Sequence, residues 1–394
     1  MIENVKLVHI MLCATFRAGL GYQDNIMPIK HKSLGYDVSI IVKDYINEKA
    51  YRVNPSSFTD INCINVHVLE PNNTFLRKMP KLRTIPNLYC RQVKGLYAKL
   101  EELSPDIIFV HGIMSVDHYD VARYVKNHPE VRLYVDNHND WYNTKDNIGL
   151  HFGRGRNAGK ELAKYARIMW GVSPWRVKYL HQVWGVPEEK ISLLVMGGDE
   201  KYIDFIREPE IRKSVRGRYG IPEDAFLLVT GGKIDEPKNI HLLASAVKRM
   251  PENVYLLIFG KVMPDMAGRL DTSDDRIRMV GWIRQEESYG LFLASDLAVF
   301  PGTHSVLWEQ ACSCGLPGVF KDWDGGFSHV DVGGNCVLLR DISEDIIYDC
   351  LSRIVSDAEI YHNMKSVARS KAVKEFSYIE IAKRAVEYEK FEGK

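Results

Sequence analysis

Residues 299–315 read VFPGTHSVLWEQACSCG, and they continue the apolar run SDLAVF. An apolar run that ends in Pro301-Gly302 is typical of a buried strand followed by a turn. The residues after the turn predict a helix with Ser305 as its N-cap and Gly315 at its end. A single carboxylate, Glu309, lies inside this mostly apolar helix. A strand, a turn and a helix in this order predict an α/β unit.

The same alternation of apolar strands and helical patterns runs along all 394 residues, a length that favours two domains. Continuous apolar runs suit parallel strands that are covered on both faces. Strands are expected at 5–12, 37–42, 106–112, 131–138, 167–173, 191–198, 225–232, 254–260, 276–282, 296–301 and 316–322. Helices are expected at 24–35, 116–129, 173–185, 239–250, 285–295, 305–315 and 376–394.

This pattern predicts two Rossmann-like, doubly wound α/β domains that face a cleft. The charged stretch 200–225 marks the boundary between them. We therefore expect an N-terminal domain over 1–200, a C-terminal domain over 201–375, and a last helix over 376–394 that returns to the N-terminal domain.

Composition excludes several classes of protein. The net charge of +1 gives no drive toward nucleic acid, and the seven cysteines form no CxxC pair. Reduced thiols in a cytoplasmic protein are the simplest interpretation. The N-terminus lacks the pattern of a signal peptide, and no apolar run approaches the ~18 residues of a membrane span. The sequence predicts a cytoplasmic protein that is at most peripheral to a membrane.

One tract between Pro71 and Leu100 is basic and contains no acid. Its cations alternate with apolar and aromatic side chains, so residues 75–99 form either a solvated face or a surface for anionic lipid headgroups or a phosphorylated acceptor. The cations are Arg77, Lys78, Lys81, Arg83, Arg91, Lys94 and Lys99.

Two loops have features of phosphate-binding sites. Gly19 and Gly21 follow the first strand, where glycines let a backbone approach a ligand and a helix N-terminus attracts an anion; a tight turn is the alternative. In TGGKIDEPKNIHLL, Lys233 and Lys238 follow a strand that is expected to end at Gly232. Two cations there can straddle a diphosphate without a metal, although solvated loop lysines would give the same pattern.

Histidines and acids give further candidates. His111 and His138 end expected strands, where a histidine contacts a sugar hydroxyl or a phosphate, or is structural. No metal-binding motif occurs, and Asp322-Trp323-Asp324 is an isolated triplet best attributed to chance. Glu309 gains ~0.3–1 kcal/mol from the helix dipole, while its carboxylate also suits two hydroxyls of a ribose.

The order of these features resembles that of the retaining glycosyltransferases of family four, which have the GT-B fold. The similarity covers most of the chain. It rests on GLGYQDNIMPIKHKSLGYDVSIIV, KISLLVMGGD, TGGKIDEPKN, RIRMVGWIRQEESYGLFLASDLAVFP and WEQACSCGLPGVF. The family has two glutamates with seven residues between them; the second matches Glu309, and Pro301 stands in place of the first.

The resemblance implies a metal-independent transferase that needs no cofactor. It would move a sugar from a nucleoside-diphosphate sugar, preferably a UDP-sugar, to a saccharide or lipid-linked acceptor of bacterial surface polysaccharide synthesis. The donor would bind the C-terminal domain and the acceptor the N-terminal domain, with the basic tract 75–99 at an anionic membrane. Two alternatives stay open, namely a non-catalytic nucleotide-binding GT-B subunit and a sugar-nucleotide epimerase.

The resemblance also assigns roles to residues. Lys233, Lys238 and His138 would have catalytic roles. Gly19 and Gly21 would let the phosphates approach the backbone closely. Trp282 and Ile283 would flank the base, and Glu309 would hold the ribose. Since the first acid is missing, the donor sugar would depend on the turn residues Thr303, His304, Ser305, Val306 and Leu307.

Overall fold

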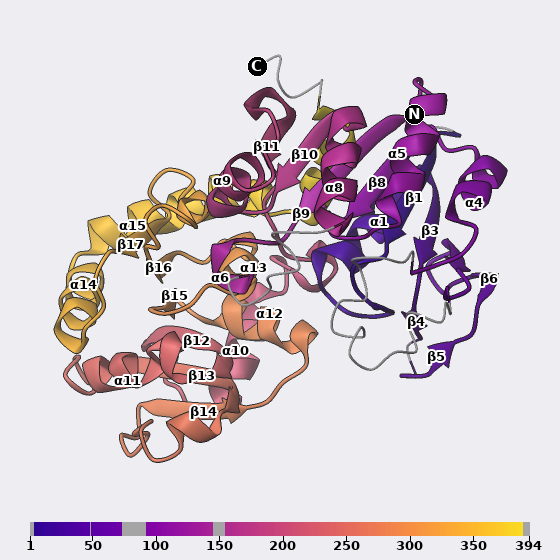
Figure 1. Ribbon diagram of the computed structural model, residues 1–394. Coiled ribbons are helices and arrows are strands. Elements are labelled where there is room, and N and C mark those ends of the chain that lie inside the picture. Colours follow the sequence, from indigo (N-terminus) through magenta and orange to yellow (C-terminus); the bar gives the residue numbers. More distant parts are fainter. Residues whose placement is uncertain (1–3, 48, 73–91, 145–153, 389–394) are drawn as a thin grey trace. The chain divides into compact units, whose positions relative to one another are not determined.

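The structure is a computed structural model, and it describes residues 4–47, 49–72, 92–144 and 154–388. Two compact units are present (Figure 1), and each is described by itself. Unit 1 comprises Met1–Val195 with Ile381–Lys394, and unit 2 comprises Met196–Glu380. Each unit contains a largely or wholly parallel sheet with helices, so the predicted α/β class is confirmed. Within the described ranges, no helix is long and apolar enough to cross a membrane.

Unit 1 has an eight-stranded sheet in the order β11-β10-β9-β8-β1-β3-β7-β6. All neighbouring pairs are parallel except β6 and β7. Because β1 lies between β3 and β8, the chain winds in opposite directions from it, and ligands bind at such a switch point beyond the strands' carboxyl ends. The strands are β1 (Lys6–Met11), β3 (Asp37–Val42), β6 (Ser56–Thr59), β7 (Asn65–Val68), β8 (Ile107–His111), β9 (Arg132–Asn137), β10 (Ile168–Gly171) and β11 (Ile191–Leu193).

The last helix is α17 (Tyr378–Val386), and its residues from Ile381 onward belong to unit 1. Its Ala385 carbonyl accepts a hydrogen bond of 3.1 Å from the buried indole of Trp170 in β10. The other helices in the described part of unit 1 are α1 (Gln23–Ser33), α4 (Leu96–Leu103), α5 (His118–Asn127), α6 (Trp141–Thr144), α8 (Arg154–Tyr165) and α9 (Pro174–Gln182). A small second sheet consists of β2 (Phe16–Arg17), β4 (Tyr45–Ile46) and β5 (Arg52–Val53).

Unit 2 has a six-stranded, wholly parallel sheet in the order β14-β13-β12-β15-β16-β17. Here β12 lies between β13 and β15, so the switch point of this sheet is at the carboxyl ends of β12 and β15. The strands are β12 (Phe226–Ile234), β13 (Val254–Val262), β14 (Ile277–Gly281), β15 (Leu297–Phe300), β16 (Gly318–Lys321) and β17 (Cys336–Leu339).

The helices of unit 2 bury their apolar faces on this sheet. For example, Leu243 and Val247 of α11 pack in one cluster with Leu228 and Val299 of the strands. The helices are α10 (Glu208–Arg218), α11 (Ile240–Lys248), α12 (Gln285–Ala294), α13 (Leu307–Ser313), α14 (Glu344–Ser356), α15 (Ala358–Val367) and α16 (Val373–Glu375), with a π-helix at Ala368–Ala372.

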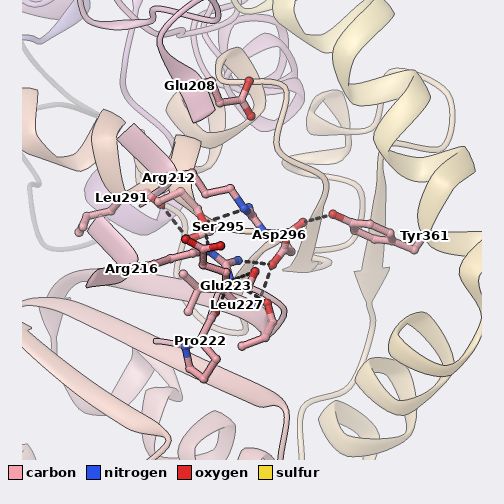
Figure 2. Close-up of polar contacts among 12 residues, drawn as sticks. Glu208, Arg212, Arg216, Pro222, Glu223, Leu227, Leu291, Ser295, Asp296 and Tyr361 are labelled. Atoms are coloured by element: carbon pink, nitrogen blue, oxygen red, sulfur yellow. Dashed lines mark hydrogen bonds and ion pairs between the residues drawn. The ribbon is translucent and has the colours of Figure 1, made fainter. Parts of the chain in front are cut away.

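A buried ion-pair network ties α10 to the sheet (Figure 2). The guanidinium of Arg216 is 2.7 Å from a carboxylate oxygen of Asp296 and also donates to the carbonyls of Ala294, Pro222 and Ala225. The same carboxylate oxygen accepts the backbone N–H of Leu227 at the start of β12. Both charged groups are buried, and each has several partners, as burial of charge requires.

Three details of the sequence interpretation are corrected. Ser305 is not the N-cap, because α13 begins at Leu307 after Val306, and the carbonyl of Ser305 accepts the N–H of Trp308. The strand expected to end at Gly232 continues as β12 to Ile234, since pairing with β13 persists to its last residue. The strand expected over 191–198 ends at Leu193.

Two further expectations concern the charged stretch 200–225 and the basic tract 75–99. The stretch 200–225 is part of unit 2, where α10 packs against α12. Most of the basic tract lies outside the described residues, namely Arg77, Lys78, Lys81, Arg83 and Arg91. Of its described members, Lys94 is 3.3 Å from Glu70 and Lys99 is 2.6 Å from Glu102.

Candidate functional site

The switch point of unit 2 is built from two loops that are hydrogen-bonded to each other. The loop after β12 carries Lys238, and the turn after β15 carries Thr303, although the two residues are 65 positions apart. The ammonium of Lys238 donates to the carbonyl of Thr303 at 2.5 Å, and the N–H of Thr303 donates to the carbonyl of Pro237 at 3.0 Å. The side-chain amide of Asn239 donates to the carbonyl of Pro301 at 3.0 Å. The adjacency of β12 and β15 therefore places Lys238 against the turn.

The close approach of these loops depends on Gly302. A Cβ atom at this position would lie 2.3 Å from the Cα of Lys238 and 2.3 Å from the carbonyl oxygen of Pro237. Both are backbone atoms, which cannot move aside as a flexible side chain can. The Pro301-Gly302 pair is thus a requirement of packing, in addition to the turn that the sequence predicts.

The two candidate lysines have different environments. Lys238 is 9% exposed and ends a short 3₁₀ turn, whereas the side chain of Lys233 is 63% exposed, lies in β12 and pairs with Asp235 at 3.0 Å. Burial lowers the pKa of Lys238 to about 8, with Asp235 opposing the shift and Lys233 adding to it. A buried cation whose charge is incompletely compensated attracts an anion more strongly than an exposed one. Lys238 is the stronger candidate for a phosphate contact.

Glu309 has partners that its neighbours in the sequence do not suggest. His304 and His329 each donate from Nε2 to its Oε1, at 2.8 and 2.9 Å, and Phe327 stacks on the ring of His304 with centroids 4.0 Å apart. The carboxylate is fully buried. Burial raises its pKa, but His304 and His329 outweigh burial and hold the pKa well below its usual range. Its Oε2 is buried and has no hydrogen-bond partner within the described residues.

The remaining candidates of unit 2 divide into two groups. The first group is half-buried and leads from the Lys238 contact into α13; it consists of Thr303, His304, Ser305, Val306 and Leu307. Leu307 lies beside Gly232. Trp282 and Ile283 follow β14 at the edge of the sheet, two strands from β12. Trp282 is 73% exposed.

In unit 1, a cavity of about 630 Å³ lies at the β1/β8 switch point. Its walls come from the loop after β1, the start of α1, and the ends of β8 and β9, including Arg17, Leu20, Asp24, His111 and His138. Gly19 adopts φ +80°, which favours glycine, in the turn that shapes one wall. Gly21 follows it and precedes α1.

Charged groups gather at the floor of this cavity. Nε2 of His138 is 3.3 Å from Asp24 and 3.6 Å from Asp136, and Nδ1 of His111 donates to Asp136 at 2.9 Å. Burial opposes protonation of His138, but Asp24 and Asp136 outweigh it and raise its pKa to about 10. The same competition raises the pKa of His111 to about 9, with Asp136 the main cause against burial. Asp24 and Asp136 are correspondingly held ionised.

Two groups among the described residues are spaced so that a metal ion would also fit them. They are His304 with Glu309 and His329, and Asp24 with Asp136 and His138. In the first group both contacts are at hydrogen-bond length, so a proton on each histidine accounts for them. In the second, the opposite charges of the imidazoles and carboxylates balance each other. The triplet Asp322-Trp323-Asp324 forms a local turn, in which Asp322 accepts the N–H of Gly325.

Comparison with known sequences gives one weak relative. No protein-family model matches the chain. An uncharacterised glycosyltransferase of Methanocaldococcus jannaschii is 20% identical over 214 residues, which are 52% of this chain and 55% of that protein. The chain thus spans about half the length of the curated relative it matches.

Comparison with solved structures covers nearly the whole chain. A glycosyltransferase of Rickettsia africae superposes with a TM-score of 0.67 at 14% identity, covering 98% of each chain. HepE of Anabaena in complex with UDP and glucose superposes with a TM-score of 0.64 at 17% identity, covering 98% of this chain and 99% of that one. A UDP-N-acetylglucosamine 2-epimerase superposes with a TM-score of 0.58 at 12% identity, covering 100% of this chain and 97% of that one. The chain has the GT-B fold, which the glycosyltransferases among these proteins share.

Proposed function

We propose that the protein is a retaining, metal-independent glycosyltransferase. It takes a sugar from a nucleoside-diphosphate sugar, with UDP favoured as the nucleotide, and transfers it to a saccharide or lipid-linked acceptor in bacterial surface polysaccharide synthesis. The observation that carries the proposal is the buried Lys238 ammonium, placed against the Thr303 turn at the switch point of unit 2. The GT-B fold and the UDP complexes of its structural neighbour HepE support the choice of donor.

The residues of unit 2 have distinct roles in this proposal. Lys238 stabilises the negative charge that develops as the diphosphate leaves, with Lys233 at the exposed side of the same site. Glu309 binds a ribose hydroxyl through Oε2, because two histidines already occupy Oε1, and this contact requires that the buried Oε2 become accessible when the nucleotide binds. Trp282 and Ile283 flank the base. His304 and Thr303 replace the missing acid at Pro301 in selecting the sugar.

Unit 1 supplies the acceptor site. His138 is a charged donor and Asp24 a charged acceptor on the floor of its cavity. In the transfer step, the bond from the sugar's anomeric carbon to the diphosphate breaks, and a bond to the acceptor oxygen forms on the same face. Since the pKa of Asp24 is well below its usual value, this carboxylate is a poor base. The acceptor's proton therefore leaves on the departing diphosphate.

Nucleotide binding tests the proposal. A ligand that binds the folded state raises its thermal stability, so UDP and UDP-glucose should raise the melting temperature more than ADP or GDP do. Release of UDP from UDP-glucose, assayed with and without candidate saccharide acceptors, then measures turnover. A chain that binds no nucleotide in calorimetry is not a glycosyltransferase of this kind, and binding without any turnover indicates a non-catalytic subunit.

The Glu309→Gln variant tests the ribose contact. It keeps an oxygen for His304 and His329 but removes the charge at the buried carboxylate. We expect the Kd of UDP to rise about 10- to 100-fold, the size of a hydrogen bond to a charged group. Isothermal calorimetry measures this, with the thermal denaturation of the unliganded variant as the control for folding. An unchanged Kd in a folded variant would remove Glu309 from the nucleotide site.

A further inference from the structure

Three histidines form a buried chain behind the cavity of unit 1. Nδ1 of His9 in β1 is 2.9 Å from Nε2 of His111, and Nε2 of His9 is 3.1 Å from Nδ1 of His31 in α1. At the ends of the chain, Nε2 of His31 donates to the carbonyl of Ala382 at 2.8 Å, and Nδ1 of His111 donates to Asp136 at 2.9 Å. All three imidazoles are at most 2% exposed. No step of the proposed transfer uses this chain.

The hydrogen bonds fix the number of protons in the chain. Each of the four contacts holds one proton, and at both ends the partner oxygen only accepts. Three neutral imidazoles carry one proton each, so the fourth contact requires one more. The chain therefore carries one positive charge when all four bonds are made.

The charge belongs on His111. Burial lowers the pKa of His31 to about 4, and burial together with His31 and His111 holds the pKa of His9 well below its usual value. His111 instead faces two carboxylates, with Asp136 at 2.9 Å and Asp24 at 3.6 Å. The carbonyl of Ala382 requires a proton on Nε2 of His31, so Nδ1 of His31 accepts from Nε2 of His9. Nδ1 of His9 then accepts from Nε2 of His111. His111 therefore carries protons on both nitrogens, because its Nδ1 donates to Asp136.

The charged His111 acts on the part of the cavity that a ligand can reach. Asp24 and His138 are each about one-third exposed there, whereas His111 and Asp136 are buried behind them. An ionised carboxylate accepts a hydrogen bond and an imidazolium donates one, and a hydroxyl group is the partner that does both. The other titratable groups around His111 are Cys13, after β1, and His9 and His31 of the chain itself.

We propose that His111 is a positioning residue, held as an imidazolium by His9 and His31, which adds to His138 in keeping Asp24 ionised so that Asp24 and His138 bind a hydroxyl group of a sugar or other polyol acceptor. The binding role rests on the proposed transferase function. The charge on His111 does not, because it follows from the hydrogen bonds within unit 1. The two parts therefore need separate measurements.

The charge is tested by nitrogen-15 spectra of the histidine rings in the full chain, which distinguish the two neutral tautomers from the imidazolium. At pH 7.5 we expect His111 to carry both protons, and His9 and His31 to carry one each, on Nε2. In His9→Leu, which removes the acceptor for His111, the titration midpoint of His111 should fall by about one pH unit or more. In His9→Asn, whose side-chain oxygen takes the place of Nδ1, the midpoint should fall much less.

A neutral His111 at pH 7.5 in the unmodified chain would overturn the proposal, and this spectrum does not depend on any variant folding. An equal midpoint in folded His9→Leu would overturn the role of His9. A stoichiometric metal ion in the purified protein, measured by mass spectrometry, would also overturn it, because a metal at Asp24, Asp136 and His138 would replace the protons.

The hydroxyl site is tested with methyl α-D-glucopyranoside and glycerol as probes, followed through the ring signals of His138. We expect both probes to shift these signals, and Asp24→Asn to abolish the shift. Asp37→Asn, at the exposed amino end of β3, is the matched control and should leave it intact. If neither probe shifts His138, the hydroxyl site is wrong, whereas failure of the transferase function itself would appear as absent UDP binding.

Discussion

Replacing Lys238 by alanine is expected to lower the turnover number for sugar transfer about 100- to 1000-fold, the usual cost of removing one group that stabilises developing negative charge. The structure gives the physical reason. The ammonium is buried and fixed on the carbonyl of Thr303, so it needs no reorganisation to meet a leaving diphosphate. Affinity for UDP should fall by a smaller factor, because the contact strengthens as the bond to the phosphate breaks.

The same lysine predicts a pH dependence. Its pKa is lowered to about 8, mainly by burial, and only the charged form stabilises a phosphate. The active fraction is therefore complete well below pH 8 and falls as the pH rises through this value. We expect kcat/KM to decline above about pH 8, since this ratio reports the groups of the free enzyme.

Lys261→Ala is the matched control, because Lys261 is exposed on the neighbouring strand β13 in register with Lys233. Its turnover should stay within about twofold of the unmodified protein, as is usual for exposed substitutions. A Lys238→Ala variant that retains its fold and more than one-tenth of the turnover would contradict the assignment. If both variants lose the same fraction of turnover, the effect comes from the overall positive charge of this face and not from the position of Lys238.

The strands and their parallel class could be predicted because continuous apolar runs reflect burial on both faces. Glu309 and Lys238 were also predicted, the first as a lone acid in an apolar helix and the second by its place after a strand. Their partners were not. The contact of Lys238 with Thr303 depends on β12 lying beside β15, and the order of strands leaves no periodic signal in the sequence.

The contacts of the histidines, like those of Lys238, could not be predicted from the sequence. His329 reaches Glu309 from a turn 20 residues away, and His9, His31 and His111 come from three separate elements. The sequence singles out His111 as the end of an expected strand, but no pattern in it indicates the contacts that His9, His31 and His329 make. The sequence does give one signal for Asp24, because its carboxylate follows Gly19 and Gly21 and lies in the first turn of α1, where the helix dipole favours a negative charge. The cap of α13 was predicted wrongly, because the helix begins at Leu307 and the carbonyl of Ser305 accepts the N–H of Trp308 in the turn before it.

The Asp296→Asn variant is expected to destabilise unit 2 by about 3–5 kcal/mol, the cost of removing one partner from a buried ion pair. Asp296 holds three groups together: Arg216 and Arg212 of α10, each at 2.7 Å, and the N–H of Leu227 at the start of β12. Asparagine keeps one accepting oxygen but leaves the buried guanidinium of Arg216 without a compensating charge. Because β12 carries one side of the switch point, the loss should also loosen the Lys238 loop.

Hydrogen exchange of peptides that cover β12 and β15 measures this loss locally, which matters because a chain of two units need not unfold in one step. The exposed pair of Asp271 with Lys248 supplies the matched control: its aspartate is 60% exposed, and Asp271→Asn should leave the stability of unit 2 nearly unchanged. If Asp296→Asn costs as little as Asp271→Asn, the carbonyls of Pro222, Ala225 and Ala294 alone satisfy Arg216, and its charge is solvated by backbone dipoles. If instead the cost is large but Asp296→Leu combined with Arg216→Met restores stability, the pair serves to fix the position of α10 more than to stabilise it, since an apolar pair of similar volume is often as stable as a buried ion pair.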